Sequence, residues 1–272
     1  MRDKLFKLYT HLSTLIVLGA SLFLIAYILI NGLPHLSLDL FSFKYTSENV
    51  SLMPALITTL YMVVLTLALA LPIGLATAIY LVEYAKKTSK FARLMKLASE
   101  TLVGIPSIIY GLFGFLFFVT SLNLSYSLIS GSLTMAIMIL PFIIRVSQEA
   151  LIDVPKSYRE AAIAMGASKL YMIFKLVLPS AAPGILSGII LSIGRIVGES
   201  AALIYTLGSV AKIPDSLFSS GRTLSIHMWA LSSEGFHTDA AYATAVILLI
   251  LVFSMNALSV YATKLLLKGK QI

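Results

Sequence analysis

Charged residues are scarce in this chain of 272 residues. Lys, Arg, Asp and Glu together make up 12% of the sequence, whereas hydrophobic residues make up 58% and the mean hydropathy is +0.95. A water-soluble domain of this length needs a polar surface that so few charges cannot supply. The composition therefore predicts an integral membrane protein.

Cysteine is absent, which excludes disulfides, thiolate nucleophiles and thiolate metal sites. The four histidines, at 11, 35, 227 and 237, are far apart and lack the spacing of metal ligands. The sequence also lacks a GxxxxGKS/T phosphate loop, an HExxH motif and a Gly-x-Ser-x-Gly motif. We therefore expect neither a metal centre nor a catalytic site in this chain.

Apolar runs long enough to cross about 30 Å of hydrocarbon as a helix occur at six places. They lie near Leu12–Ile30, Pro54–Val82, Leu102–Leu122, Leu128–Ile144, Ala181–Leu207 and Ala240–Leu266. The first run has no clear cleavage site and is longer than the apolar part of a signal peptide, so we interpret it as a spanning helix. The expected fold class is an all-α membrane protein with six transmembrane helices.

The basic residues favour one orientation. With the N-terminus inside, only Lys44, Lys212 and Arg222 fall outside, and Arg195 lies within the membrane. The other sixteen of the 20 basic residues fall on the cytoplasmic side: Arg2, Lys4, Lys7, Lys86, Lys87, Lys90, Arg93, Lys96, Arg145, Lys156, Arg159, Lys169, Lys175, Lys264, Lys268 and Lys270. This asymmetry predicts cytoplasmic termini. It also accounts for the net charge of +8 without nucleic acid binding.

The longest cytoplasmic connection, at about 153–178, has the pattern of two short helices. Pro155 suits a first helical turn, Gly166 suits a position just after a helix, and Pro179 is expected to end the second helix before the next span. Periodicity alone leaves two interpretations open. The segment is either an amphipathic connector on the lipid headgroups or a docking element for another protein.

Arg195 and Glu199 interrupt the fifth apolar run. Arg195 is about 22 Å from Ser180 and about 18 Å from Leu207 along a helix, and a lone charge at that depth costs at least ~2.5–3.5 kcal/mol. A small and polar stripe shares this helix face, and it must face protein or water: Gly184, Gly188, Ser192, Arg195 and Glu199. The pair is either a self-contained ion pair that locks helix packing, or an anion contact in a pathway in which Glu199 weakens the hold of Arg195.

Other features of the spans have simpler interpretations. Gly104, Pro106 and Gly111 are expected to allow a kink or close packing rather than to touch a substrate. Glu83 and Glu100 are expected to be interfacial charges that face water or basic neighbours.

The loop at 153–178 resembles the EAA loop of ABC-type importer permeases, because Gly166 and Leu178-Pro179 follow Glu160-Ala161-Ala162 at the matching spacing. The resemblance implies coupling helices that dock, through Glu160, Ala161, Ala162 and Gly166, on a cytosolic ATPase subunit. It also implies that this chain carries no cofactor, since ATP and magnesium would bind to two partner ATPase subunits.

Most of the chain resembles the phosphate transport system permeases, and the C-terminal part resembles their PstA-type subunit. The segments that carry this resemblance are LMPALITTLYMVV, PIGLATAIYLVEYA, GIPSIIYGLFG, LPFIIRVSQEAL and GRIVGESAALIYTLG. Ala202 departs from the pattern, which usually has proline after Gly-Glu-Ser/Thr-Ala.

This second resemblance implies a type I ABC importer permease (MetI-like) fold in a prokaryotic plasma membrane. It implies an N-terminal helix and outer loop at 1–53, a five-helix core at 54–272, a paralogous permease partner in a heterodimer, an external phosphate-binding protein and contact with membrane lipid. The expected substrate pathway contains Arg195, Glu199, Ser192 and Tyr110. The alternatives are the PstC-type subunit, a permease for another oxyanion, and a membrane sensor or scaffold without transport.

Overall fold

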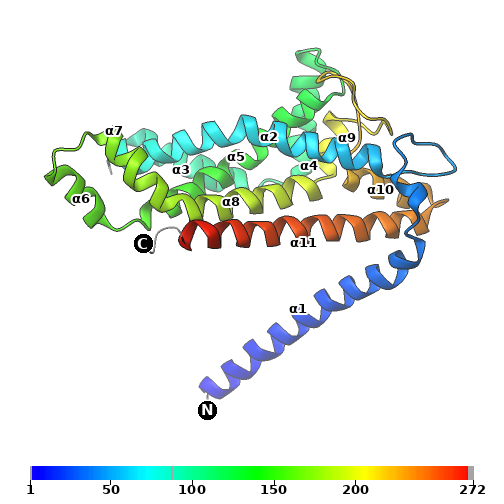
Figure 1. Cartoon of the computed structure of the whole chain (residues 1–272), viewed down its shortest axis with the longest axis horizontal. Helices are drawn as coiled ribbons and strands as arrows, with labels where there is room; N and C mark the ends of the chain where they lie inside the picture. Colours follow the sequence, from blue (N-terminus) through cyan, green and yellow to red (C-terminus); the bar gives the residue numbers. More distant parts are fainter. Residues whose placement is uncertain (1, 87, 269–272) are drawn as a thin grey trace.

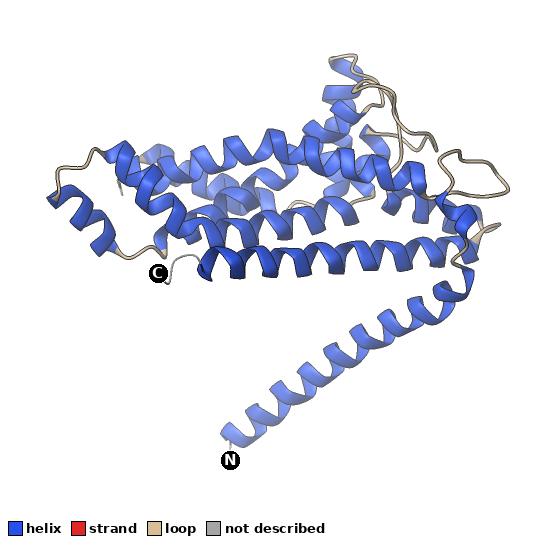
Figure 2. Ribbon diagram, in the orientation of Figure 1, coloured by secondary structure: helices blue, strands red, loops and turns tan. Residues whose placement is uncertain are grey.

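The computed structural model describes residues 2–86 and 88–268, and every regular element within these ranges is helical (Figures 1 and 2). The α-helices are α1 (Arg2–Gly32), α2 (Met53–Ile79), α3 (Lys90–Val103), α4 (Ser107–Gly114), α5 (Leu128–Ile152), α6 (Lys156–Ala164), α7 (Lys169–Met172), α8 (Leu178–Gly198), α9 (Ala201–Thr206), α10 (Leu224–Glu234) and α11 (Thr238–Lys268). Short 3-10 helices, η1 (Leu33–His35) and η2 (Leu38–Phe41), follow α1. Wider π-helical turns are η3 (Tyr80–Tyr84), η4 (Phe115–Ser121) and η5 (Ile173–Val177). Lys87 and Lys270, which the sequence assigned to the cytoplasmic side, lie outside the described residues.

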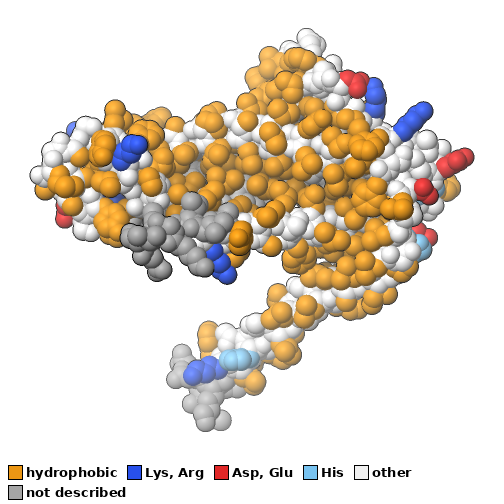
Figure 3. Space-filling view, in the orientation of Figure 1, with side chains coloured by type: hydrophobic (Ala, Val, Ile, Leu, Met, Phe, Trp, Pro, Cys, Tyr) orange, Lys and Arg blue, Asp and Glu red, His pale blue; other side chains and the backbone are white. Residues whose placement is uncertain are grey.

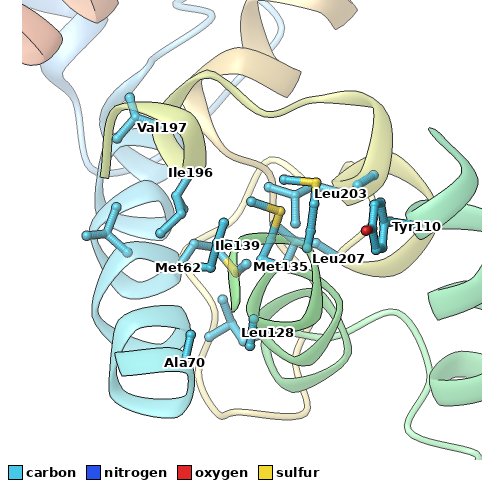
Figure 4. Close-up of a cluster of buried hydrophobic side chains, with 14 of the residues drawn as sticks. Met62, Ala70, Tyr110, Leu128, Met135, Ile139, Ile196, Val197, Leu203 and Leu207 are labelled. Atoms are coloured by element: carbon cyan, nitrogen blue, oxygen red, sulfur yellow. The ribbon is translucent and has the colours of Figure 1, made fainter. Parts of the chain in front are cut away.

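The long helices α2, α5, α8 and α11 lie side by side as a bundle, with α5 packed against both α2 and α8 (Figure 1). Figure 4 shows the centre of the bundle, where Met135 and Ile139 of α5 meet Met62 of α2 and Ile196 of α8. These side chains are fully buried. The bundle therefore has a continuous apolar interior, formed by side chains of α2, α5 and α8.

Five described helices are long and apolar enough to cross a membrane, and a sixth crossing results if the bent pair of α3 and α4–η4 is one span. This agrees with the six expected spans, but the third span is not the single helix predicted at Leu102–Leu122. The chain bends by 104° between Val103 and Ser107. Pro106 explains the break, because proline has no amide hydrogen and disfavours helical geometry in the residue before it.

The fifth span also differs from the prediction of one helix at Ala181–Leu207. It begins further upstream, since α7, η5 and α8 form one continuous helix from Lys169 to Gly198. Pro179 does not end a helix, because it lies in the first turn of α8 and the π-helical turn η5 precedes it. The span then stops at Glu199, whose backbone is extended, and α9 starts after Ser200.

Helix α1 diverges from the bundle, and its apolar window is not buried by the rest of the chain (Figure 1). It meets α11 near its own C-terminal end, where the rings of Tyr27 and Tyr242 pack edge to face. Gly32 lies so close to α11 that an added Cβ would be 2.5 Å from the Tyr242 carbonyl oxygen. The first turns of α1 and the last described turns of α11 lie toward the end of the bundle that carries α6 and α7 (Figure 1).

The visible surface of the bundle is apolar along its length, and most of the coloured charges lie toward its two ends (Figure 3). Large exposed apolar side chains of the helices include Val64, Ile73, Leu116 and Leu191. Such a band is what a lipid-facing surface requires.

Candidate functional site

The small-residue face of α8 packs against α5. A Cβ added at Gly184 would lie 2.7 Å from the Ala150 Cβ, and one at Gly188 would overlap the Val146 side chain. Ser192 is fully buried on the same face, and its hydroxyl donates to the Gly188 carbonyl at 3.0 Å. Glycine at these positions therefore allows the two helices to approach closely, and the Ser192 hydroxyl is satisfied within its own helix.

Arg195 and Glu199 do not form the ion pair that one continuous helix would favour. The helix ends at Gly198, and no salt bridge joins the two side chains among the described residues. A Glu199 carboxylate oxygen instead accepts the Ala202 amide hydrogen at 3.0 Å, and the Glu199 carbonyl accepts the Ser225 hydroxyl at 2.6 Å. Glu199 thus caps α9, and the half-buried Arg195 has no carboxylate within salt-bridge distance in the part of the chain that the structure describes.

Tyr110 lies beside this break. Its side chain is buried, and its hydroxyl donates to the Leu102 carbonyl at 2.8 Å, which joins α4 to the end of α3 across the bend. The Arg195 guanidinium is within electrostatic range of this phenol. Gly111 packs on α9, since an added Cβ would be 2.8 Å from the Ala202 Cα. The breaks in the third and fifth spans therefore meet, and they bring Tyr110, Arg195 and Glu199 into one region.

A cavity of about 570 Å³ adjoins the break in the fifth span, between α8, α10, α11 and α1. Five hydroxyl-bearing residues line it, Ser200, Ser225, Ser232, Thr238 and Tyr242, together with Gly198, Met228, Trp229, Ala241, Ala245 and Ile28. The cavity is large enough for a small hydrated anion and supplies neutral hydrogen-bonding groups rather than charge.

The loop at 153–178 has the geometry expected for its first helix. Gly166 adopts φ +75, and the Ala167 amide donates to the Ala162 carbonyl at 3.0 Å. This left-handed turn after the helix is the glycine C′ position that the sequence predicted. Ala162 is fully buried, whereas Glu160 and Ala161 are exposed.

The outward surface of this loop is apolar. Its exposed side chains include Tyr158, Ile163, Met165, Leu170 and Tyr171. Met165 is 79% exposed and Ile163 is 65% exposed, so α6 and α7 carry apolar surface that the rest of this chain leaves uncovered.

Comparison with known proteins assigns the chain to a family. Residues 70–268 match the family described as binding-protein-dependent transport system inner membrane component. The chain belongs to this family of ABC transporter permeases. Its members are the non-catalytic membrane components of these transporters, so the permease is a multi-pass membrane protein.

Relatives extend over nearly all of the permease. It is 30% identical to the probable ABC transporter permease protein YqgI of Bacillus subtilis, over 94% of this chain and 93% of that protein. It is 32% identical to the phosphate transport system permease protein PstA of Xylella fastidiosa, over 88% of this chain and 83% of that protein. PstA 1 of Mycobacterium tuberculosis H37Rv is 40% identical over 57% of this chain and 49% of its own length.

Solved structures show the same fold at low identity. A chain of a bacterial alginate ABC transporter has a TM-score of 0.70 at 18% identity, covering 95% of the permease and 96% of that chain. A chain of the inward-facing MetNI methionine ABC transporter has a TM-score of 0.63 at 21% identity, covering 78% and 93%. The type I, MetI-like fold expected from the sequence is therefore confirmed.

Glu83 and Glu100 each have the basic neighbour that the sequence allowed, but the members of two charged clusters of the permease were not paired by sequence reasoning. Beside the loop at 153–178, Glu83 is buried against Arg159, whereas Glu100, outside this cluster, is exposed beside Lys96 at 3.9 Å. At the opposite end of the bundle, the Arg222 guanidinium is buried 4.6 Å from the centre of the Tyr45 ring. Burial and the neighbouring Arg222 charge lower the pKa of His227 to about 3. Both clusters join segments that are distant in the sequence, so no local sequence pattern predicts them.

Proposed function

We propose that the permease is the PstA-type subunit of an ATP-driven importer of inorganic phosphate. The main observation in favour of an anionic substrate is Arg195. Its guanidinium is half-buried within a membrane span and has no carboxylate partner among the described residues. A guanidinium can donate two parallel hydrogen bonds to the oxygens of a phosphate. The relatives named as phosphate permeases support this choice of anion.

In this proposal the two broken spans present Arg195 to the pathway. Glu199 holds the break open by capping α9 rather than by neutralising Arg195. Tyr110 connects α4 to the end of α3 across the bend in the third span. Ser192 is a neutral residue on the face of α8 that packs against α5. In this proposal the anion meets a single strong cation, an arrangement that allows binding weak enough for release.

The proposal includes the partners that such a subunit needs. An external phosphate-binding protein delivers the anion, and a paralogous permease completes the pathway as a heterodimer. Two cytosolic ATPase subunits bind ATP and magnesium and dock on α6, with Glu160 at the rim of the contact and the exposed Ile163 and Met165 toward its centre. The termini lie in the cytoplasm, residues 1–53 form the N-terminal helix and outer loop, and residues 54–272 form the core.

The decisive experiment is phosphate uptake into vesicles that contain the permease, its paralogue, the ATPase and the binding protein. Labelled phosphate should accumulate only with ATP, and unlabelled sulfate should not compete. Arg195→Gln should abolish uptake while the complex still assembles. Arg145→Gln is the matched control, because Arg145 is 61% exposed at the end of α5, and it should leave uptake unchanged. Normal uptake by an assembled Arg195→Gln complex would refute the pathway role.

The docking role has a separate test. Glu160→Lys should lower the amount of ATPase that co-purifies with the permease and should reduce uptake in proportion, because it reverses the charge at the rim of the contact. A sensor or scaffold without transport predicts that wild-type vesicles take up no phosphate at all.

A further inference from the structure

Arg159 and Glu83 form the most deeply buried ion pair of the described residues. Their side chains are 18% and 5% exposed, and the shortest distance between them is 2.7 Å. In the other four described pairs, each side chain is at least 44% exposed. Exposed ion pairs contribute little to stability, because water and salt screen them. A buried, hydrogen-bonded pair instead holds its two side chains in a fixed geometry.

The guanidinium of Arg159 joins three elements. Its Nε and Nη2 donate to the same Glu83 oxygen at 3.0 and 2.7 Å. Its Nη1 donates to the Val154 carbonyl and its Nη2 to the Leu151 carbonyl, both at 2.9 Å. These carbonyls lie at and just beyond the end of α5, where helix carbonyls lack intrahelical partners. One side chain of α6 therefore holds the end of α2 and the end of α5.

A second cation connects the same turn of α2 to α7. The Lys169 Nζ lies 4.3 Å from the centre of the ring of Tyr84, the residue that follows Glu83. Both residues belong to η3, the π-helical turn that ends this span. Helices α6 and α7 are thus each attached to η3 by a basic side chain.

Beneath these polar contacts the packing is apolar. Ala162 of α6 belongs to a buried cluster with Ala78 of α2, Leu151 of α5 and Met172 of α7. Apolar contacts are not directional, so they permit α6 to slide along α2. The chain itself connects α6 only to α5 and to α8 through α7. Helix α2 packs along α5, and the ion pair adds to this apolar packing a contact of fixed direction between α6 and the end of the second span.

We propose that Arg159 and Glu83 are a positioning pair that transmits movement of α6 to α2 and to the end of α5. The inference rests on the proposed coupling to a cytosolic ATPase. Movement of α8 follows from its continuity with α7, and the ion pair makes α2 move with it. Helices α2 and α8, which both pack against α5, then respond together to one docking event.

The test measures ATP hydrolysis and phosphate uptake in the same vesicles. Glu83→Gln keeps the shape of the side chain and removes its charge, so the complex should assemble and hydrolyse ATP. Phosphate transported per ATP should fall about tenfold, within the 5–150-fold range of typical coupling between sites. Glu149→Gln is the matched control, because it breaks the exposed Arg145–Glu149 pair on α5 and should leave the ratio unchanged.

The outcomes separate the two proposals. If wild-type vesicles transport phosphate and Glu83→Gln keeps the wild-type ratio within twofold, the positioning role is wrong and the proposed function stands. Wild-type complexes that hydrolyse ATP but never transport phosphate would overturn the proposed function, and this role for the pair with it.

The absence of cysteine allows a second, independent measurement. Glu83→Cys combined with Arg159→Cys removes the ion pair and introduces the only two thiols of the permease. The reduced double variant should transport little phosphate per ATP. A short bifunctional thiol reagent that joins the two positions should restore most of the ratio, because the link then replaces the ion pair. A cross-linked permease that stays as uncoupled as the reduced one would contradict the inference.

Discussion

Substitution of Gly111 by alanine tests how tightly the two broken spans meet. An added Cβ would be 2.8 Å from the Ala202 Cα, 3.1 Å from the Ala202 oxygen and 3.2 Å from the Ala201 oxygen. Ordinary contacts begin near 3.4 Å, so the α9 backbone would have to retreat by about 0.6 Å. All three atoms belong to the backbone, and no side-chain rotation can relieve the overlap.

The magnitude follows from two opposing terms. Overpacking of this kind costs about 1–3 kcal/mol, and alanine in place of helical glycine returns roughly 0.5–1 kcal/mol. The net loss is therefore at most roughly 2.5 kcal/mol. At about 2–4 °C per kcal/mol for a chain of this size, the apparent Tm of the purified permease in detergent should fall by up to about 10 °C.

Gly194→Ala is the matched control. Gly194 lies in α8, and an added Cβ would meet no atom of another part of the chain within 4 Å. The same substitution should therefore raise the apparent Tm of the isolated permease by about 1–4 °C, because only the propensity term acts. The two variants should shift in opposite directions. A Gly111→Ala permease as stable as Gly194→Ala would refute the close contact between α4 and α9.

Three further substitutions probe other parts of the structure. Glu199→Ala removes the cap of α9 and should cost about 0.5–2 kcal/mol in thermal unfolding, whereas Glu199→Gln keeps an acceptor for the Ala202 amide and should cost less. Because the pKa of His227 is about 3 when folded and near 6.5 when unfolded, the unfolded chain binds more protons between these values. Stability should therefore fall as pH is lowered below about 6.5, and His227→Phe should lose less apparent Tm between about pH 7.5 and pH 5. Gly166→Val should reduce phosphate uptake more than Gly166→Asn, since Asn tolerates the left-handed backbone at φ +75 and a β-branched residue does not.

The sequence predicted those features that depend on local composition. Apolar length located the six crossings, because the energy of transfer into lipid depends on runs of side chains rather than on their contacts. The turn at Gly166 was also predictable, since glycine adopts the left-handed backbone conformation more readily than any other residue. Prolines and glycines of the third span indicated an irregular helix, although not the 104° bend.

The break in the fifth span could not be seen from hydropathy. A hydropathy window averages over Gly198–Ala202 and finds no interruption, because the break is set by one carboxylate that accepts the amide three residues later. An acidic residue three positions before a helical amide is a capping signal, and it was present in the sequence. From the sequence, Glu199 was considered only as a partner of Arg195, and its role as the cap of α9 was therefore missed.

Contacts between residues far apart in the sequence are harder still to predict from the sequence. Arg159 and Glu83 are 76 residues apart, and each separately looks like an ordinary charge at the end of a helix. Only the fold shows that they share a buried position. The substrate role of Arg195 likewise depends on groups that approach it in space, among which Tyr110 comes from the other broken span.

The separation of α1 from the bundle bears on how the permease is made. Tyr27 meets its neighbour Tyr242 across 215 positions of sequence. At roughly 5–20 residues per second, the ribosome needs about 10–40 s to produce that stretch. The first span must therefore reside in lipid before the last span exists. During this interval its exposed length is open to other helices in the membrane, so a subunit synthesised nearby can reach α1 before its own chain does.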